Sequence, residues 1–286
     1  MLGKSTAFSE NRILTCRGKI LDLNAPKIMG IINLSANSFF DGGQNIKNDF
    51  FLIKAEELIK GGASILDIGA ASTKPGSKII SIDEEWKILE RPLRLLKEKY
   101  PELLFSIDTY HAATAQKAAD LGVEIINDIS GGTIDSKMFE VVAKNQMAYV
   151  LMHIKGRPEN MQQNPVNGDV VASIQGFFEN QLAHLEKAGV QTILLDPGFG
   201  FGKTLDQNYQ LLNNLSQFKQ FDRPLLVGLS RKSMIFKLLD INPQEALNGT
   251  AVLNTIALLN GANILRVHDA QQAHETIQLI MKYKQF

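Results

Sequence analysis

The chain of 286 residues has little cysteine and no long apolar run. Its one cysteine, Cys16, excludes an internal disulfide framework and is typical of proteins in a reducing compartment. No apolar stretch approaches the roughly 20 residues that a membrane-spanning helix requires. The first twelve residues also lack the apolar core of a secretory signal. We therefore expect a cytoplasmic protein.

The chain also lacks a net charge, because 30 basic residues balance 30 acidic ones. Proteins that bind nucleic acid or anionic membranes through long-range attraction carry an excess of basic residues. We therefore expect neither nucleic acid nor a membrane among the partners, whereas a local cluster of cations can still bind a small anion. No low-complexity segment or Ser/Pro-rich linker suggests an internal boundary.

What the sequence does contain is a series of short runs of Ile, Leu and Val, each followed by an amphipathic segment. The runs cover residues 28–34, 64–68, 104–108, 125–129, 148–153, 192–196, 224–229 and 264–268. Such continuous apolar character is typical of parallel strands that are covered on both faces. Eight strands and eight helical connections in about 250 residues predict an α/β protein with a single (β/α)₈ TIM barrel. A doubly wound open sheet shows the same alternation and is the alternative.

Local signals mark the helix boundaries between these runs. Ser81 and Glu84 have the spacing of a capping box, and Asn242 with Pro243 combines a cap with an N1 proline. Pro92 is expected to kink or divide the helix over 81–100. Helix ends are predicted at Gly61, Gly122 and Gly189.

An earlier segment, I-L-T-C-R-G-K-I-L-D-L, has two apolar runs joined at Arg17-Gly18 and predicts a β-hairpin. We expect this hairpin to cap the floor of the barrel. The chain then divides into an N-terminal extension with the hairpin, residues 1–27, and one barrel domain, residues 28–286.

A glycine-rich loop follows one of the runs, in T-I-L-L-D-P-G-F-G-F-G-K-T. It looks like a phosphate-binding loop, but the pattern G-x-x-x-x-G-K-S/T requires a glycine where this chain has Pro197. The glycines at 198, 200 and 202 do not fit G-x-G-x-x-G either. We therefore expect Lys203 to matter far less than Asp196, the carboxylate that directly follows the apolar run.

Polar residues stand at the predicted carboxyl ends of the strands, where TIM barrels place their active sites. The set comprises Asn33, Asp67, Asp108, Asn127, His153, Asp196, Arg266 and His268, together with the segment Ser230-Arg231-Lys232-Ser233. Any one of them could be a structural polar group with a partner. Several carboxylates at one rim, however, are costly to bury without cations or a ligand. We predict a ligand site there, with Asp67 either structural or functional.

One part of this set suits a heterocyclic ring. Asp108, Asn127 and Asp196 offer two carboxylates and an amide, which could pair with the adjacent N–H donors and carbonyl of an aminopyrimidinone. Lys232 could serve the ring carbonyl or a ring nitrogen.

A second part suits an anion. Asn33, Arg266 and His268 offer donors and one metal-ligand oxygen, as a phosphate or diphosphate with Mg²⁺ requires. Ser233 opens a helix whose free N–H groups favour a carboxylate or phosphate, although it could also be an ordinary N-cap. The glycine-containing loops 35–43 and 71–77 could close over a ligand.

The strand ends and the loops after them contain, in chain order, the segments I-M-G-I-I-N-L-S-A-N-S-F-F-D-G-G, D-I-G-A-A-S-T-K-P-G, S-I-D-T, I-N-D-I-S-G-G, V-L-M-H-I-K-G-R-P-E-N-M-Q, L-D-P-G-F-G-F-G-K-T, G-L-S-R-K-S and R-V-H-D. In this order, the segments resemble the signatures of the dihydropteroate synthase family. The resemblance implies a TIM-barrel enzyme of folate biosynthesis, acting as a homodimer. With Mg²⁺, it would join 4-aminobenzoate to 6-hydroxymethyl-7,8-dihydropterin diphosphate, giving 7,8-dihydropteroate and diphosphate.

The resemblance also implies roles for particular positions. The pterin would contact Asp108, Asn127, Met152, Asp196 and Lys232. The diphosphate would contact Asn33, Thr73, Arg266 and His268, with Asn33 as the ligand of Mg²⁺. The 4-aminobenzoate would contact Phe39, Pro75, Phe201 and Ser233. Catalytic roles would fall to Asp108, Asp196, Lys232 and Asp41.

Because no serine, cysteine or lysine nucleophile stands in a convincing triad, we expect no covalent enzyme intermediate. The arylamine would attack after diphosphate departs. Two rivals are a pterin-binding methyltransferase domain that serves a corrinoid protein, and a pterin-binding protein without turnover. The methyltransferase would have no reason for S-R-K-S or S-T-K-P-G.

Two loops depart from the family pattern. Ala36, Asn37 and Phe40 replace a proline, an acid and a serine, and Lys74 replaces an arginine. Loss of the proline loosens the first loop, and lysine cannot form the bidentate pairs of arginine. Loop closure, 4-aminobenzoate affinity and sulfonamide response are open on these grounds.

Overall fold

The computed structural model describes residues 13–34, 50–70, 80–157, 159–161, 163 and 165–286. Within them, the predicted apolar runs form eight parallel strands. These are β3 (Lys27–Asn33), β4 (Ile65–Gly69), β5 (Leu104–Asp108), β6 (Ile125–Asp128), β7 (Ala148–Met152), β8 (Ile193–Asp196), β9 (Leu226–Val227) and β10 (Ile264–Val267). Their order is β8-β7-β6-β5-β4-β3-β10-β9. A bridge between Leu195 and Leu225 brings the two outer strands together. The TIM barrel is confirmed, and the open sheet is excluded.

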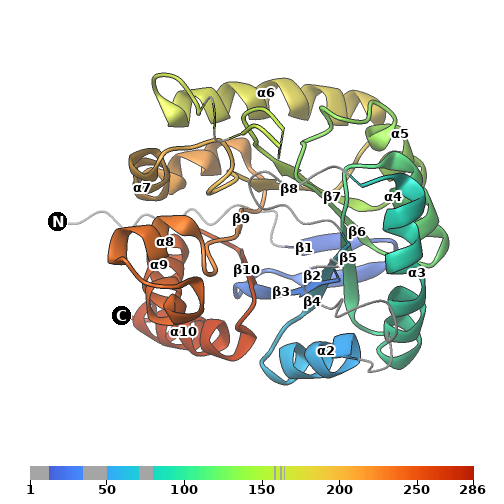
Figure 1. Ribbon diagram of the computed structural model, residues 1–286, viewed down its shortest axis with the longest axis horizontal. Helices are drawn as coiled ribbons and strands as arrows, with labels where there is room; N and C mark the ends of the chain where they lie inside the picture. Colours follow the sequence, from blue (N-terminus) through green and yellow to red (C-terminus); the bar gives the residue numbers. More distant parts are fainter. Residues whose placement is uncertain (1–12, 35–49, 71–79, 158, 162, 164) are drawn as a thin grey trace.

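Helices surround this barrel on its outside (Figure 1). They are α2 (Phe50–Lys60), α3 (Ile82–Lys99), α4 (Ala112–Asp120), α5 (Met138–Lys144), α6 (Val170–Ala188), α7 (Leu205–Asn213), α8 (Ser233–Leu239), α9 (Leu247–Leu259) and α10 (Ala270–Tyr283), with 3₁₀ turns η1 (Leu215–Phe221) and η2 (Pro243–Glu245). Among the described residues, no helix combines the length and the apolar character needed to cross a bilayer.

Most of the predicted helix signals are confirmed. Ser81 and Glu84 form the reciprocal capping box of α3, and Gly189 ends α6 in the left-handed conformation, with φ 86°. Of the two effects predicted for Pro92, division of the helix is wrong, because α3 runs unbroken through it, whereas a kink stays a prediction. Proline removes one hydrogen bond, but Pro92 is buried together with Leu89 and Leu93, and this packing holds the helix together.

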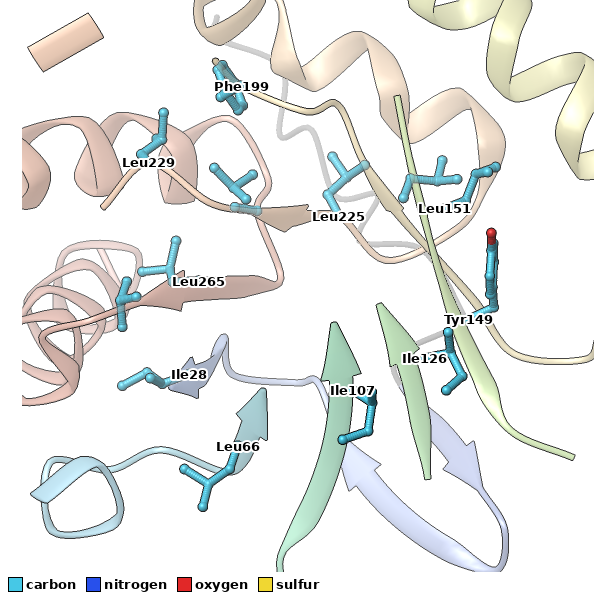
Figure 2. Close-up of a cluster of buried hydrophobic side chains, with 14 of the residues drawn as sticks. Ile28, Leu66, Ile107, Ile126, Tyr149, Leu151, Phe199, Leu225, Leu229 and Leu265 are labelled. Atoms are coloured by element: carbon cyan, nitrogen blue, oxygen red, sulfur yellow. The ribbon is translucent and has the colours of Figure 1, made fainter. Parts of the chain in front are cut away.

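Side chains on a strand alternate between its two faces, so the barrel has two apolar layers. The outward layer packs under the helices, and Figure 2 shows Leu66, Ile107 and Leu265 among its members. The inward layer lies at the floor, where strand residues such as Met29 and Ile65 form one buried cluster with side chains of the N-terminal hairpin.

The hairpin itself consists of β1 (Ile13–Cys16) and β2 (Lys19–Asp22). Arg17 and Gly18 both have positive φ, as a two-residue hairpin turn requires. Leu14, Cys16 and Leu21 join the floor cluster, so the hairpin caps the floor as predicted.

The floor also carries an ion cluster. Glu124 is buried and pairs with Lys19 at 2.9 Å and with Lys97 of α3 at 2.7 Å. This fastens the hairpin to the barrel.

The inward positions change from apolar to polar along each strand. On β4 they are Ile65, Asp67 and Gly69, on β5 Leu104, Ser106 and Asp108, and on β6 Ile125 and Asn127. The polar members stand at the carboxyl ends, opposite the hairpin. The sequence pattern therefore builds a dry floor and a polar mouth.

Candidate active site

Arg266 of β10 lies at the centre of a hydrogen-bonded network at this mouth. Its Nε donates to Oδ2 of Asp67 at 2.6 Å, and its Nη2 donates to Oδ2 of Asp108 at 2.8 Å. Nδ2 of Asn127 donates to the same Asp67 oxygen at 3.0 Å. The sequence assigned Arg266 to an anion and Asp108 and Asn127 to a ring, but the structure joins Arg266 to Asn127 through Asp67 and to Asp108 directly. Asp67 therefore positions two residues of the site.

The register of the strands sets Gly69, Asp108 and Asn127 side by side across β4, β5 and β6. A Cβ atom at Gly69 would lie 3.2 Å from the Cβ of Asp108, so a side chain there would crowd this carboxylate. Among the described residues, Oδ1 of Asn127 and Oδ1 of Asp67 are buried and have no hydrogen-bond partner. Buried acceptors normally have a donor, so these two oxygens are available to the N–H groups of a ligand.

Asp196 and Lys232 form the other side of the mouth. Oδ1 of Asp196 accepts from the amide of Gly198 at 2.7 Å. Nζ of Lys232 donates to the carbonyl oxygen of Phe199 and lies 4.8 Å from the centre of the Phe201 ring. Asp196 ends β8 and Lys232 lies in the loop after the neighbouring strand β9, and each influences the ionisation of the other.

Burial governs the ionisation of these groups. It raises the pKa of Asp108 to about 7, against the opposing effect of Arg266. It also raises the pKa of Asp196, while Lys232 and Arg266 act in the opposite direction. Burial lowers the pKa of Lys232 to about 8, with Asp196 in opposition. Burial would lower the pKa of Arg266 as well, but Asp67 and Asp108 outweigh it and raise the pKa.

His268 follows β10 and is held by Ser230. Its backbone amide donates to Oγ of Ser230 at 3.2 Å, and the same oxygen lies 3.0 Å from Nδ1 of the ring. Burial, followed by Arg266, lowers the pKa of His268 to about 4, so the ring is neutral at pH 7. In the tautomer in which Oγ of Ser230 donates to Nδ1, the neutral ring carries its N–H on Nε2, which can then donate to an anion.

A bidentate ion pair joins the loop after β9 to the residues that follow β10. Arg231 donates to both oxygens of Asp269, at 2.9 and 2.7 Å. Arg231 has a φ of 54°, which is unusual for a non-glycine residue. Asp269 is not among the predicted site residues, although an acid directly after His268 is a usable signal.

An apolar wall completes the mouth. Met152 is 2% exposed, ends β7 beside Asp196 of β8, and packs with Tyr110, Ile129 and Phe201. Such a wall can cover the face of a flat ring.

Two further predicted residues have clear places in the fold. Asn33 ends β3, level with Gly69 of β4. Ser233 is the first residue of α8, and Lys232 is the N-cap, so the alternative that Ser233 is the N-cap is wrong. The predicted residues Phe39, Asp41, Thr73 and Pro75, and the departures Ala36, Asn37, Phe40 and Lys74, lie outside the described residues.

The glycine-rich loop does not have the form of a phosphate cradle. The amide of Gly200 donates to Oδ1 of Asn208 at 2.7 Å, and the amide of Gly198 donates to Asp196. Nζ of Lys203 donates to the carbonyl oxygen of Gly198 at 2.8 Å. The loop therefore uses its donors internally. Lys203 is also only 3% exposed, and the expectation that it matters far less than Asp196 stays a prediction.

Described oxygen ligands are too few to hold a metal ion by themselves. No group of three or more His, Cys, Asp or Glu side chains with suitable geometry occurs among the described residues. Mg²⁺ commonly takes one or two protein oxygens and completes its shell with substrate phosphates and water. The side-chain amide oxygen of Asn33 could be one such protein ligand.

This barrel, with buried carboxylates and an amide around its mouth, defines a pterin-binding enzyme. Residues 29–268 match the family described as "Pterin binding enzyme". Within this family the chain belongs to the dihydropteroate synthases.

Curated relatives and solved structures support this placement. The dihydropteroate synthase of Escherichia coli (strain K12) is 39% identical over 269 residues, which cover 93% of this chain and 95% of the relative. That of Synechocystis sp. is 40% identical over 249 residues, 85% of each chain. A Yersinia pestis dihydropteroate synthase with a sulfonamide drug has a TM-score of 0.90 at 38% identity, covering 96% of this chain and all (100%) of the other. The Thermus thermophilus enzyme with 4-aminobenzoate has a TM-score of 0.84 at 33% identity, covering 95% and 99%.

Proposed function

We propose that the mouth of the barrel binds 6-hydroxymethyl-7,8-dihydropterin diphosphate and 4-aminobenzoate side by side and joins them into 7,8-dihydropteroate, with release of diphosphate. One observation carries the proposal: in the described part of the chain, the buried side-chain oxygen of Asn127 has no donor, in the network of Asp67, Arg266 and Asp108. The N–H edge of an aminopyrimidinone supplies the missing donors. Small-molecule complexes among the similar structures point the same way.

The pterin would enter between the two sides of the mouth. Asn127 and the carboxylates of Asp108 and Asp196 accept its N–H groups, and Lys232 donates to the ring carbonyl or a ring nitrogen. Met152 covers one face of the ring. The diphosphate then lies against Arg266 and the Nε2 side of His268, where donors meet negative charge.

The reaction needs charge stabilisation rather than a protein nucleophile. The bond from the exocyclic carbon to the diphosphate oxygen breaks, and its electron pair leaves with the diphosphate. Asp108 and Asp196 stabilise the positive charge that develops on the pterin. The arylamine attacks the carbon, the C–N bond forms, and the amine loses a proton. No enzyme–pterin bond is made at any stage.

The 4-aminobenzoate would lie on the outer side, against Phe201 and the start of α8 at Ser233. Phe39, Asp41, Thr73 and Pro75 belong to the proposal through the family resemblance. Mg²⁺ would be held by Asn33 and by diphosphate oxygens, and when bound it neutralises the departing diphosphate.

A homodimer and a cytoplasmic location are also part of the proposal. Large apolar side chains are exposed on the last helices: Val252 and Leu259 of α9, and Leu279 and Tyr283 of α10. Cys16, the one cysteine of the chain, is buried and free. Sedimentation of the purified chain would reveal a dimer, and Leu279→Glu should convert it to a monomer.

The decisive assay supplies both substrates and Mg²⁺ and measures diphosphate and dihydropteroate. We expect equimolar products that depend on 4-aminobenzoate. Tight binding of the pterin diphosphate without any product would favour a binding protein, and methyl transfer from a methylated folate would favour the methyltransferase. Mass spectrometry that finds a pterin-modified residue would refute the absence of a covalent intermediate.

A further inference from the structure

Lys203 is a buried cation that the proposed reaction does not use. Its Nζ donates to Nδ1 of His153 at 3.0 Å, and to the carbonyl oxygens of Gly198 at 2.8 Å and Phe201 at 3.1 Å. All of these acceptors are neutral: burial, with Lys203 next, lowers the pKa of His153 to about 2. Burial also lowers the pKa of Lys203, to about 7, with Asp196 in opposition. Replacing a buried charged group by an apolar side chain of similar volume is often neutral or stabilising, so the presence of a lysine at this position requires an explanation.

The loop that Lys203 holds is built from left-handed glycines. Gly198, Gly200 and Gly202 have φ angles of 71°, 83° and 65°. A Cβ atom at Gly198 would lie 1.9 Å from the carbonyl oxygen of His153, and one at Gly202 would lie 2.7 Å from that of Lys155. Backbone therefore packs directly on backbone. Glycines lose more conformational freedom on folding than other residues, so an ordered loop of this kind needs additional stabilising contacts. Lys203 supplies such contacts by donating to the carbonyl oxygens of Gly198 and Phe201.

The loop carries the aromatic part of the mouth. The ring of Phe201 stands against Lys232 and packs on the cluster that contains Met152. The carbonyl of Phe199 accepts from Lys232. Fixing the carbonyls of Gly198 and Phe201 therefore fixes the ring of Phe201 and one partner of Lys232.

We propose that Lys203 is a positioning residue for the arylamine half of the site: its ammonium locks the glycine-rich loop so that Phe201 borders the 4-aminobenzoate. This inference rests on the proposed function for the identity of the substrate. The pterin half depends on it less, because three of its four polar residues, Asp108, Asn127 and Asp196, project from the strands β5, β6 and β8, and only Lys232 contacts the loop through the carbonyl of Phe199.

The test compares Lys203→Met with Lys97→Met. Both remove a lysine with restricted exposure, but Lys97 belongs to the ion cluster at the barrel floor. For Lys203→Met we expect a rise of about tenfold in the KM for 4-aminobenzoate, with less than about a threefold change in the Kd of the pterin diphosphate measured by calorimetry. Lys97→Met should leave both constants unchanged even where it lowers the Tm. Equal losses for both substrates, or a lower Tm with both constants unchanged, would overturn the proposal.

A double-mutant cycle tests whether Lys203 acts through Phe201. Phe201→Leu should raise the KM for 4-aminobenzoate, and adding Lys203→Met should then change it by less than about twofold, because coupled residues are not additive. Fully additive effects would contradict the mechanism. If Lys203→Met does not fold, Lys203→Gln, which keeps one donor, should show a smaller shift of the same kind.

Hydrogen exchange separates this inference from the proposed function. In Lys203→Met we expect the amides of residues 198–202 to exchange at least about tenfold faster, while the amides of β5 and β6 keep their rates. This holds whichever reaction the enzyme performs. Unchanged exchange in the loop would overturn the positioning role, whereas a wild-type chain without 4-aminobenzoate-dependent product would overturn the proposed function instead.

Discussion

Arg266 and Asp67 are 199 residues apart in the sequence, yet they form an ion pair of 2.6 Å at the mouth of the barrel. The carboxylate is fully buried, and its Oδ2 also accepts from Asn127 at 3.0 Å. One oxygen thus sets the position of a guanidinium and of an amide that both face the proposed ligand. Asp67 therefore links two residues of the site, although it is itself fully buried.

Asp67→Asn should damage both stability and binding. The change leaves Arg266 with only Asp108, and disrupting a buried pair in this way costs about 3 kcal/mol of unfolding free energy. The Kd of the pterin diphosphate should rise about tenfold, equivalent to about 1.4 kcal/mol. Urea unfolding and calorimetry measure the two effects. Glu186→Gln removes an exposed pair with Arg223 and serves as the control, with an effect below about 1 kcal/mol. An unchanged Kd in Asp67→Asn would show that Asp67 does not position the site.

The reaction should have a narrow pH optimum. Asp108 must be ionised to stabilise positive charge, and burial raises its pKa to about 7, so kcat/KM should rise as the pH rises through that value. Lys232 must be charged, and burial lowers its pKa to about 8, so kcat/KM should fall above that pH. In Lys232→Arg the alkaline limb should move to higher pH, because a guanidinium keeps its proton. A flat profile between about pH 6 and pH 9 would contradict these assignments.

Two glycines of the loop after β8 should respond differently to alanine. Both Gly198 and Gly200 have positive φ, so each substitution incurs about 1 kcal/mol of backbone strain. Among the described residues, a Cβ at Gly200 meets only the side chain of Lys232, with Cδ at 3.4 Å, whereas one at Gly198 would overlap the carbonyl of His153. We therefore expect Gly198→Ala to lower the unfolding free energy by about 3 kcal/mol and Gly200→Ala by about 1 kcal/mol. Thermal unfolding of the pair measures the difference, and equal losses would mean that the close approach is unimportant.

Much of the fold could be predicted because buried parallel strands have a strong local signature. All eight apolar runs form strands, although in the run over 224–229 the strand covers only Leu226–Val227. The helix over 81–100 shows the limit of local reasoning: burial of Pro92 overrides its helix-breaking tendency. Whether such a local preference is realised depends on tertiary packing, which the sequence does not show.

The candidate site was predictable residue by residue but not contact by contact. Asp108, Asn127, Asp196 and Lys232 could be found because each follows an apolar run, and the TIM barrel places such ends at one rim. The partner of Arg266 could not be found, since no spacing rule connects β4 with β10. The contacts of Lys203 could not be found for a similar reason: two of its acceptors are backbone carbonyls, which carry no sequence signal.

The central claim is that one bicyclic diphosphate ester spans the carboxylates and the cations of a single mouth. Calorimetry with two ligands, the pterin diphosphate and the hydroxymethyl pterin without diphosphate, tests it most directly. Asp196→Asn should weaken both ligands alike, by about a hundredfold. His268→Ala should weaken only the diphosphate ester, by about tenfold. Equal weakening of both ligands by His268→Ala, or no effect of Asp196→Asn on either, would contradict the account.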